Sequence, residues 1–153
     1  RYLIGIDIGT SATKTVLFDE NCRVVKSASQ EYPLAQPQNG WAEQEPLDWY
    51  SAVMTTVKQV VRESGVPAAD IKGIGLSGQM HGLVMLDDKD QLLGRSIIWC
   101  DQRTSEQAQF IEDKIGRDKL ISITANPAIT GFTAAVTLTN CRYTQPLKPK
   151  STQ

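Results

Sequence analysis

Runs of apolar residues at the start of the chain alternate with short polar stretches in the manner of β-strands. Residues 2–8 are apolar on both faces apart from Gly5 and Asp7, which predicts a central strand covered on two sides. Residues 14–19 and 23–29 follow as two further strand-like runs. The pattern therefore predicts a meander of three strands joined by tight turns.

The hydrophobic period changes at residue 47, where apolar residues begin to recur at the three- and four-residue spacing of a helix face. Pro46 suits the first position of this helix, and Gly65 suits its end. Residues 32–46, which precede the helix, are rich in proline and predict a loop.

A second group of elements is expected further along the chain. Residues 71–76 predict a short buried strand, and residues 83–86 with 91–99 predict a hairpin around a polar turn. The capping-box spacing of Thr104 and Gln107 opens a second amphipathic helix. This order of elements predicts a mixed α/β sheet with flanking helices, of the ribonuclease H-like type, rather than a doubly wound sheet.

Composition narrows the possible functions. The 153 residues include 16 Lys and Arg against 17 Asp and Glu, so we expect neither nucleic acid nor a membrane surface as a partner, and a small ligand fits better. With no apolar run near the roughly 18 residues that span a bilayer, and no signal segment, we expect a soluble, cytoplasmic protein. Three cysteines without metal-ligand spacing predict free thiols; they are Cys22, Cys100 and Cys141.

The turn after the first strand carries the first candidate chemistry. A carboxylate such as Asp7 at the end of a buried strand is costly to desolvate unless a positive or donating group lies beside it, and magnesium-bound phosphate is such a group. Gly9 permits close backbone approach or a positive φ, while Thr10, Ser11 and Thr13 offer hydroxyls and consecutive N–H groups for an anion. Lys14 adds a positive charge. The alternative is a hairpin whose Asp caps its own turn.

Residues 73–78 match the dinucleotide pattern G-x-G-x-x-G. That pattern binds a pyrophosphate only where the glycines follow a strand and open a helix. Because these glycines lie within a predicted strand, we do not expect a nicotinamide-dependent oxidoreductase. The glycines are better explained as places where a neighbouring backbone or a ligand comes close.

The stretch Ser-Gly-Gln-Met-His-Gly at 77–82 ends the same strand. It contains Gln79, Met80 and His81, the only histidine, between glycines, and this mixture is typical of a small-molecule pocket. The alternative for His81 is a hydrogen-bonded histidine of the core or of a loop.

A third polar cluster, Trp99, Asp101 and Arg103, ends the next predicted strand. Polar groups at several strand ends favour a shared crevice. The alternatives are that Asp101 begins a helix and pairs with a nearby base, and that Trp99 belongs to the core.

Together these motifs resemble the FGGY family of carbohydrate kinases, over residues 2 to about 134. The opening motif is shared with the actin, hexokinase and heat-shock-chaperone superfamily, so it indicates phosphate handling and no particular substrate. The Gln-Met-His-Gly stretch looks like members that phosphorylate D-xylulose rather than glycerol or ribulose. The resemblance rests on residues 7–11 with Lys14, 40–46, 78–82, 98–103 and 131–134.

The resemblance implies an ATP- and Mg²⁺-dependent transfer of the γ-phosphoryl group to the C5 hydroxyl of D-xylulose. It implies that Asp7 binds the magnesium of the nucleotide. The residues implied to face the ATP phosphates are Gly9, Thr10, Ser11 and Lys14. Those implied to contact or surround the sugar are Gln79, Met80, His81, Trp99, Asp101 and Arg103. The resemblance leaves open whether the parent enzyme is a homodimer.

The resemblance also sets limits. Family members are much longer, and their catalytic Asp follows the region matched here, so residues 1–134 are expected to form an incomplete N-terminal domain with no catalytic residue. Alone, the chain is expected neither to phosphorylate xylulose nor to bind ATP tightly. Residues 135–153 lose helical periodicity and depart from the family pattern, and we expect a poorly ordered tail from about residue 141.

Two other functions remain open on sequence grounds. One is a kinase of the same family acting on ribulose, gluconate or glycerol. The other is a non-catalytic sugar-binding or actin-like interaction module on the same scaffold, which explains the opening motif but not the later ones.

Overall fold

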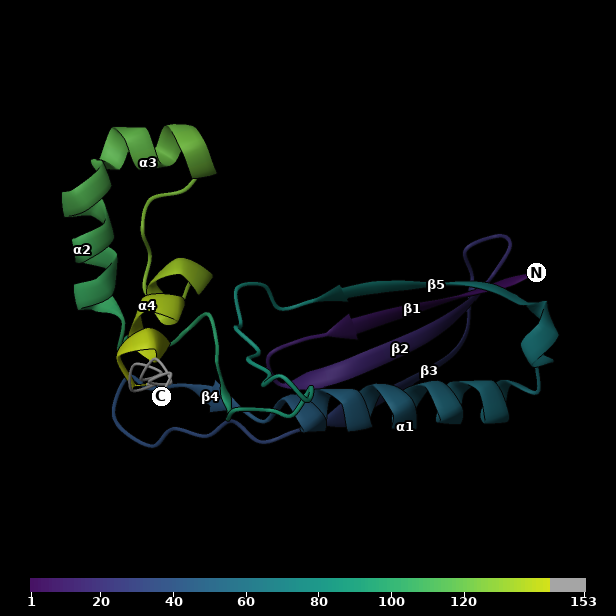
Figure 1. The fold of residues 1–153 in the computed structure, drawn as a ribbon. Coiled ribbons are helices and arrows are strands. Elements are labelled where there is room, and N and C mark those ends of the chain that lie inside the picture. The colour runs from purple at the N-terminus through teal and green to yellow at the C-terminus, as the bar shows by residue number, and fades with distance from the viewer. Residues whose placement is uncertain (144–153) are drawn as a thin grey trace, which may run out of the picture. The chain divides into compact units, whose positions relative to one another are not determined.

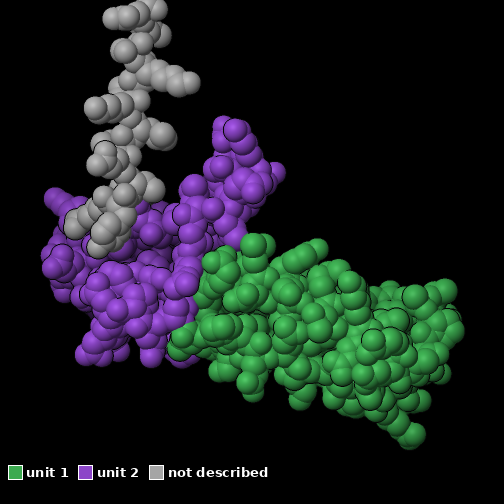
Figure 2. All heavy atoms as spheres, turned by 90° about the horizontal axis from the view of Figure 1, so that it is seen from below, with its two compact units in different colours: residues 1–34, 44–80 green, residues 35–43, 81–153 purple. Residues whose placement is uncertain are grey.

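The computed structural model describes residues 1–143 of the chain (Figure 1). The chain forms two compact units, shown in different colours in Figure 2. Unit 1 comprises residues 1–34 and 44–80, and unit 2 comprises residues 35–43 and those from 81 onward. No helix within residues 1–143 is both long and apolar enough to cross a membrane.

Unit 1 is built on a four-stranded mixed sheet, as predicted. Its strands are β1 (Tyr2–Ile8), β2 (Ala12–Asp19), β3 (Val24–Glu31) and β5 (Ile71–Gly78), in the order β3-β2-β1-β5. The first three form the predicted antiparallel meander, and β5 pairs with β1 in parallel. The glycines of the G-x-G-x-x-G pattern therefore lie within a strand, as expected.

Helix α1 (Pro46–Ser64) runs along one face of this sheet, over β2 and β3 (Figure 1). Proline occupies the first turn, and Gly65 ends the helix with a left-handed φ of 69°. The hydroxyls of Thr15 and Thr56, 2.7 Å apart, link β2 to α1 inside the core. The apolar side chains buried at the centre are Ile4, Ile6, Leu17, Ala28 and Val60.

The expected burial of β1 on both faces and of β5 is wrong. Among the described residues of unit 1, α1 is the only long helix, and it packs over β2 and β3 rather than β5. Ile74 and Leu76 of β5 are exposed, the latter to 71%, and Leu3 of β1 is exposed on the opposite face.

Unit 2 contains the remaining helices. They are α2 (Ser105–Ile115), α3 (Arg117–Thr124) and α4 (Thr133–Tyr143), and α2 packs against both of the others. The two-residue strands β4 (Glu43–Gln44) and β6 (Ser96–Ile97) pair, and the boundary between the units falls inside β4.

The predicted hairpin at 83–99 is reduced to a turn. One carboxylate oxygen of Asp87 accepts hydrogen bonds from the backbone N–H groups of Lys89 and Gln91, at 2.8 Å each. Beyond the turn, Leu86 and Leu92 form one isolated bridge. The polar turn is thus confirmed, whereas its predicted flanking strands are not formed except at β6.

Two expectations about helices are also corrected. Thr104 precedes α2, but its side chain does not cap the helix, because its hydroxyl accepts a hydrogen bond from the Gly131 N–H at 2.9 Å. Residues 133–143 form α4 although the sequence lacks helical periodicity there; among residues 133–140, Ala135, Val136 and Thr139 are buried. The remainder of the expected tail, residues 144–153, lies outside the described part of the chain.

Candidate functional site

The turn between β1 and β2 depends on Gly9. Its N–H donates to the carbonyl oxygen of Ala12 at 3.0 Å, which closes the turn. A Cβ at position 9 would lie 3.1 Å from that same oxygen, so a side chain would crowd the turn. Close backbone approach, one of the two reasons expected for a glycine here, is therefore confirmed. The expectation that the Thr13 hydroxyl faces an anion is wrong, because Thr13 is fully buried in β2.

Asp7 and Lys14 are cross-strand partners of β1 and β2. Both side chains are exposed, and with Ser77 of β5 they line a shallow hollow on the sheet. The expectation of a buried carboxylate at Asp7 is therefore wrong, because nothing in unit 1 covers this end of β1. The site combines one negative and one positive side chain beside the Gly9 turn.

The donor set at this turn suits only one kind of metal binding. Within residues 1–143, no three His, Cys, Asp or Glu side chains come together as a protein-only metal site. Magnesium commonly binds through one or two carboxylates and takes its other ligands from water and substrate phosphates. A single exposed carboxylate such as Asp7, beside a phosphate-type turn, fits that second mode.

Hydrogen bonds of the Gln44 side chain link the Gly9 turn to two other segments of unit 1. Gln44 Nε2 donates to the Thr10 carbonyl at 2.7 Å, and Gln44 Oε1 accepts from Gln79 Nε2 at 2.7 Å and from Trp49 Nε1 at 3.1 Å. Because a carbonyl can only accept, the orientation of the buried Gln44 amide is fixed. The end of β5 and the start of α1 are thereby tied to the same turn.

Tyr32, directly after β3, forms two further hydrogen bonds to the Gly9 turn. Its hydroxyl donates to the Gly9 carbonyl, and its backbone N–H donates to the Ser11 carbonyl at 3.3 Å. Burial raises the pKa of the Tyr32 hydroxyl, and the negative charge of Asp7 acts in the same direction. The hydroxyl therefore keeps its proton and remains a donor at neutral pH.

In unit 2, Asp101 and Arg103 form a buried ion pair. Asp101 is 0% exposed, and one of its oxygens accepts from the Ala42 N–H at 2.7 Å and from Arg103 at 2.7 Å. The Arg103 guanidinium also donates to Glu43 at 2.7 Å and lies 3.6 Å above the Trp41 ring centroid. The alternative in which Asp101 pairs with a nearby base is thus confirmed, and α2 begins later, at Ser105.

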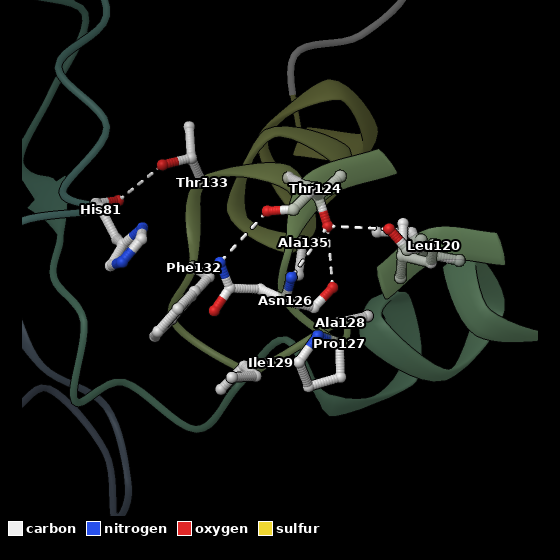
Figure 3. A pocket seen from close by; sticks show the side chains of 12 residues that line it. His81, Leu120, Thr124, Asn126, Pro127, Ala128, Ile129, Phe132, Thr133 and Ala135 are labelled. Carbon is white, nitrogen blue, oxygen red and sulfur yellow. Dashed lines mark hydrogen bonds between the residues drawn. The ribbon is translucent and has the colours of Figure 1, made fainter. Parts of the chain in front are cut away.

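His81 lies in a loop of unit 2, with its ring stacked on Phe132 at 3.7 Å between centroids and 15° between planes. The Thr133 hydroxyl donates to the His81 carbonyl at 3.2 Å (Figure 3). Phe132 and Thr133 belong to the stretch 131–134, in which the Gly131 N–H donates a hydrogen bond to the Thr104 hydroxyl. A cavity of about 230 Å³ adjoins His81; its walls include Ile111, Leu120, Ile129 and Phe132.

Comparison with known proteins places the chain in a family. Residues 2–139 match the N-terminal domain of the FGGY family of carbohydrate kinases. The chain belongs to this family. This FGGY N-terminal domain is 46% identical over 133 residues to the xylulose kinase of Bacillus subtilis (strain 168), a match that covers 87% of the chain and 26% of that kinase.

Solved structures agree with this assignment. The FGGY domain superposes on a xyloylose kinase from Brucella ovis with a TM-score of 0.86 and 34% identity, over 93% of this chain and 29% of that one. For a gluconate kinase from Lactobacillus acidophilus the TM-score is 0.72 and the identity 35%, over 79% and 24%. The chain thus spans about a quarter of the length of the curated relatives that it matches. The mixed α/β fold of an FGGY sugar kinase is confirmed.

The FGGY domain distributes the predicted site residues over both units. In unit 1, Gln79 is joined through Gln44 to the Gly9 turn, whereas Met80 is 72% exposed. In unit 2, Trp99 is half-exposed, and the segment that contains it packs against Gly131. The predicted residues of unit 1 are Asp7, Gly9, Thr10, Ser11, Lys14, Gln79 and Met80. Those of unit 2 are His81, Trp99, Asp101 and Arg103.

Sequence reasoning assigned no role to Gln44, Tyr32, Phe132 or Thr133. Gln44 and Phe132 lie inside stretches that carry the family resemblance, which was the only available signal for them. Tyr32 had no such signal, because its bond to Gly9 joins positions that are 23 residues apart.

Proposed function

We propose that this chain is the N-terminal part of an ATP-dependent kinase that phosphorylates D-xylulose to D-xylulose 5-phosphate. The observation that carries the proposal is the 46% identity to a xylulose kinase across 87% of the chain. The family match over residues 2–139 includes both the Gly9 turn and the His81 stretch. The cytoplasm, where ATP and sugars meet, is the proposed location.

On this proposal the Gly9 turn faces the β- and γ-phosphates of ATP. Thr10 and Ser11 supply hydroxyls and N–H groups, and Lys14 supplies a positive charge. Asp7 would hold Mg²⁺ on the phosphate side, where a bound metal would supply positive charge against the developing negative charge of the phosphoryl group. Gln44 and Tyr32 support the proposal because they fix the carbonyls of the turn and so orient its N–H groups.

The sugar is proposed to lie against unit 2 residues near His81. The edge of the His81 ring carries two nitrogens that can form hydrogen bonds with the hydroxyl groups of a sugar. Met80 and Gln79 lie next to His81 in the chain. Trp99 is proposed to form the wall of the sugar site, and the buried Asp101–Arg103 pair holds the segment that carries it.

No residue of this chain is proposed as the catalytic base. Asp101 is unsuited to that role, because its carboxylate is buried and accepts several hydrogen bonds from Arg103. A base must reach the proton of the attacking hydroxyl, and a carboxylate held in this way does not. The base is therefore assigned to the part of a full-length kinase beyond this chain, and the chain alone is expected to show no turnover.

Calorimetric titration of the purified chain tests the sugar assignment. D-xylulose is expected to bind more tightly than D-ribulose, D-gluconate or glycerol, and His81→Ala is expected to weaken D-xylulose binding about tenfold, the loss of one or two hydrogen bonds to the ligand. Arg117→Ala, an exposed change in α3, is the control. Tighter binding of gluconate would favour the gluconate kinase alternative, which the similarity to that kinase supports. Equal binding by the His81→Ala variant would refute the assignment.

A further inference from the structure

His81 has a backbone conformation that needs support. Its φ is 69°, in the left-handed region that residues with a side chain occupy uncommonly. Such a conformation persists when surrounding contacts hold it, and it is often found at ligand sites. The contacts that hold His81 are therefore part of any site that it forms.

Two consecutive residues supply these contacts. Phe132 covers one face of the imidazole ring at 3.7 Å, nearly parallel to it, and Thr133 donates a hydrogen bond to the His81 carbonyl. One contact fixes the plane of the ring, and the other fixes the backbone that carries it (Figure 3). Stacking occupies a face of the ring and leaves its two nitrogens at the edge available for polar groups.

The segment that carries Phe132 and Thr133 is itself anchored. The Gly131 N–H donates to the fully buried hydroxyl of Thr104, and a Cβ at position 131 would lie 2.3 Å from the Trp99 carbonyl oxygen. Residue 131 therefore sits directly against the segment that contains the Asp101–Arg103 ion pair. The segment that contains the ion pair therefore keeps residues 131–133 in place, and Phe132 and Thr133 in turn contact His81.

We propose that Phe132 and Thr133 are positioning residues that set the affinity for the sugar by fixing the ring plane and the backbone of His81. This inference rests on the proposed function, because it takes His81 as a contact of the sugar. The two side chains act through His81. Their loss therefore weakens D-xylulose binding without removing any group that touches the sugar.

NMR can test this directly, because His81 is the only histidine of the chain. The imidazole signals of the whole 153-residue chain belong to one residue, and His81→Ala removes them. Phe132→Leu removes the stacked aromatic ring and keeps an apolar side chain on the wall of the adjoining cavity. Thr133→Val removes the hydroxyl at an exposed position and keeps the shape of the side chain. Phe132→Tyr and Thr133→Ser are the matched controls that keep each contact.

The measurement is a D-xylulose titration followed at the His81 signals. Phe132→Leu is expected to shift those signals in the free chain and to weaken binding about tenfold. Thr133→Val is expected to weaken binding about fivefold, whereas the two conservative variants remain within about twofold of the unsubstituted chain. If Phe132→Leu fails to fold, Thr133→Val against Thr133→Ser decides the question.

Two results would overturn the inference in distinguishable ways. If Phe132→Leu and Thr133→Val bind D-xylulose like the unsubstituted chain while His81→Ala does not, the positioning role is wrong and the proposed function stands. If the unsubstituted chain and His81→Ala give the same response to D-xylulose, the sugar assignment fails, and the positioning role fails with it.

Discussion

Replacing Asp101 by alanine is expected to destabilise unit 2 by about 3–5 kcal/mol. The carboxylate is fully buried, and the Arg103 side chain that it binds is only 8% exposed. Without Asp101 the guanidinium keeps its contact with Glu43 but loses the fully buried one of these two counter-charges, and the Ala42 N–H loses its acceptor. Removing a buried carboxylate from such a network is far more damaging than removing an exposed ion pair.

Urea denaturation of the Asp101→Ala variant measures this effect, with Trp fluorescence as the signal. Arg117→Ala is the matched control, because it removes the largely exposed partner of the ion pair with Glu112 and should change the free energy of unfolding by less than about 1 kcal/mol. Equal losses in the two variants would mean that the Asp101–Arg103 pair contributes no more than an exposed pair.

Gly131→Ala is expected to be the other severe change, with a loss of about 4 kcal/mol or more in the free energy of unfolding. Gly131 has a φ of 72°, and its Cβ would meet the carbonyl oxygens of Trp99 at 2.3 Å and of Asp101 at 2.9 Å. These are backbone atoms, so rotation of a side chain cannot relieve the overlap. The segment 131–133 must move, and with it the anchor on Thr104.

A comparison with Gly65→Ala distinguishes the effect of steric crowding from that of backbone strain. Gly65 has a similar φ of 69°, but nothing lies within 4 Å of its Cβ position. Gly65→Ala should therefore lose only the strain of a left-handed alanine, about 1–2 kcal/mol. Circular dichroism during thermal unfolding compares the two variants, and a Gly131→Ala variant as stable as Gly65→Ala would contradict the close approach at Trp99.

The local elements could be predicted from the sequence because nearby residues determine them. The β1–β3 meander follows from apolar runs broken by polar turns, and α1 follows from helical spacing between Pro46 and Gly65. The position of Gly9 in a tight turn also followed from its neighbours. In each case the deciding contacts join residues close together in the chain.

The failures involve contacts between residues far apart in the chain. The spacing of Thr104 and Gln107 suited a capping box, but Gly131, 27 residues away, takes the Thr104 hydroxyl. The burial of Asp7 and of β5 was inferred from their apolar neighbours, although burial depends on which elements pack over the sheet. The periodicity of one segment contains no information about that packing.

The sequence identifies only part of the candidate site, because contacts between residues far apart in the chain also build this site. His81 and Asp101 could be identified as unusual residues at strand ends, but the sequence could not show that Asp101 is bound to Arg103 or that His81 rests on Phe132. Gln44 was visible only as one letter of a family-like stretch. Its role depends on amide contacts with Thr10 and Gln79, 34 and 35 residues away.

The central claim is that this chain supplies the phosphate turn and the sugar contacts of a xylulose kinase. It is tested most directly by replacing the matching region of the Bacillus subtilis xylulose kinase with residues 1–134 and measuring phosphorylation of D-xylulose and D-gluconate. We expect the folded chimera to prefer D-xylulose, and its Asp7→Ala variant to lose activity about a hundredfold or more through lost stabilisation of transition-state charge. A folded chimera that prefers D-gluconate, or that keeps its full activity without the Asp7 carboxylate, would contradict the account.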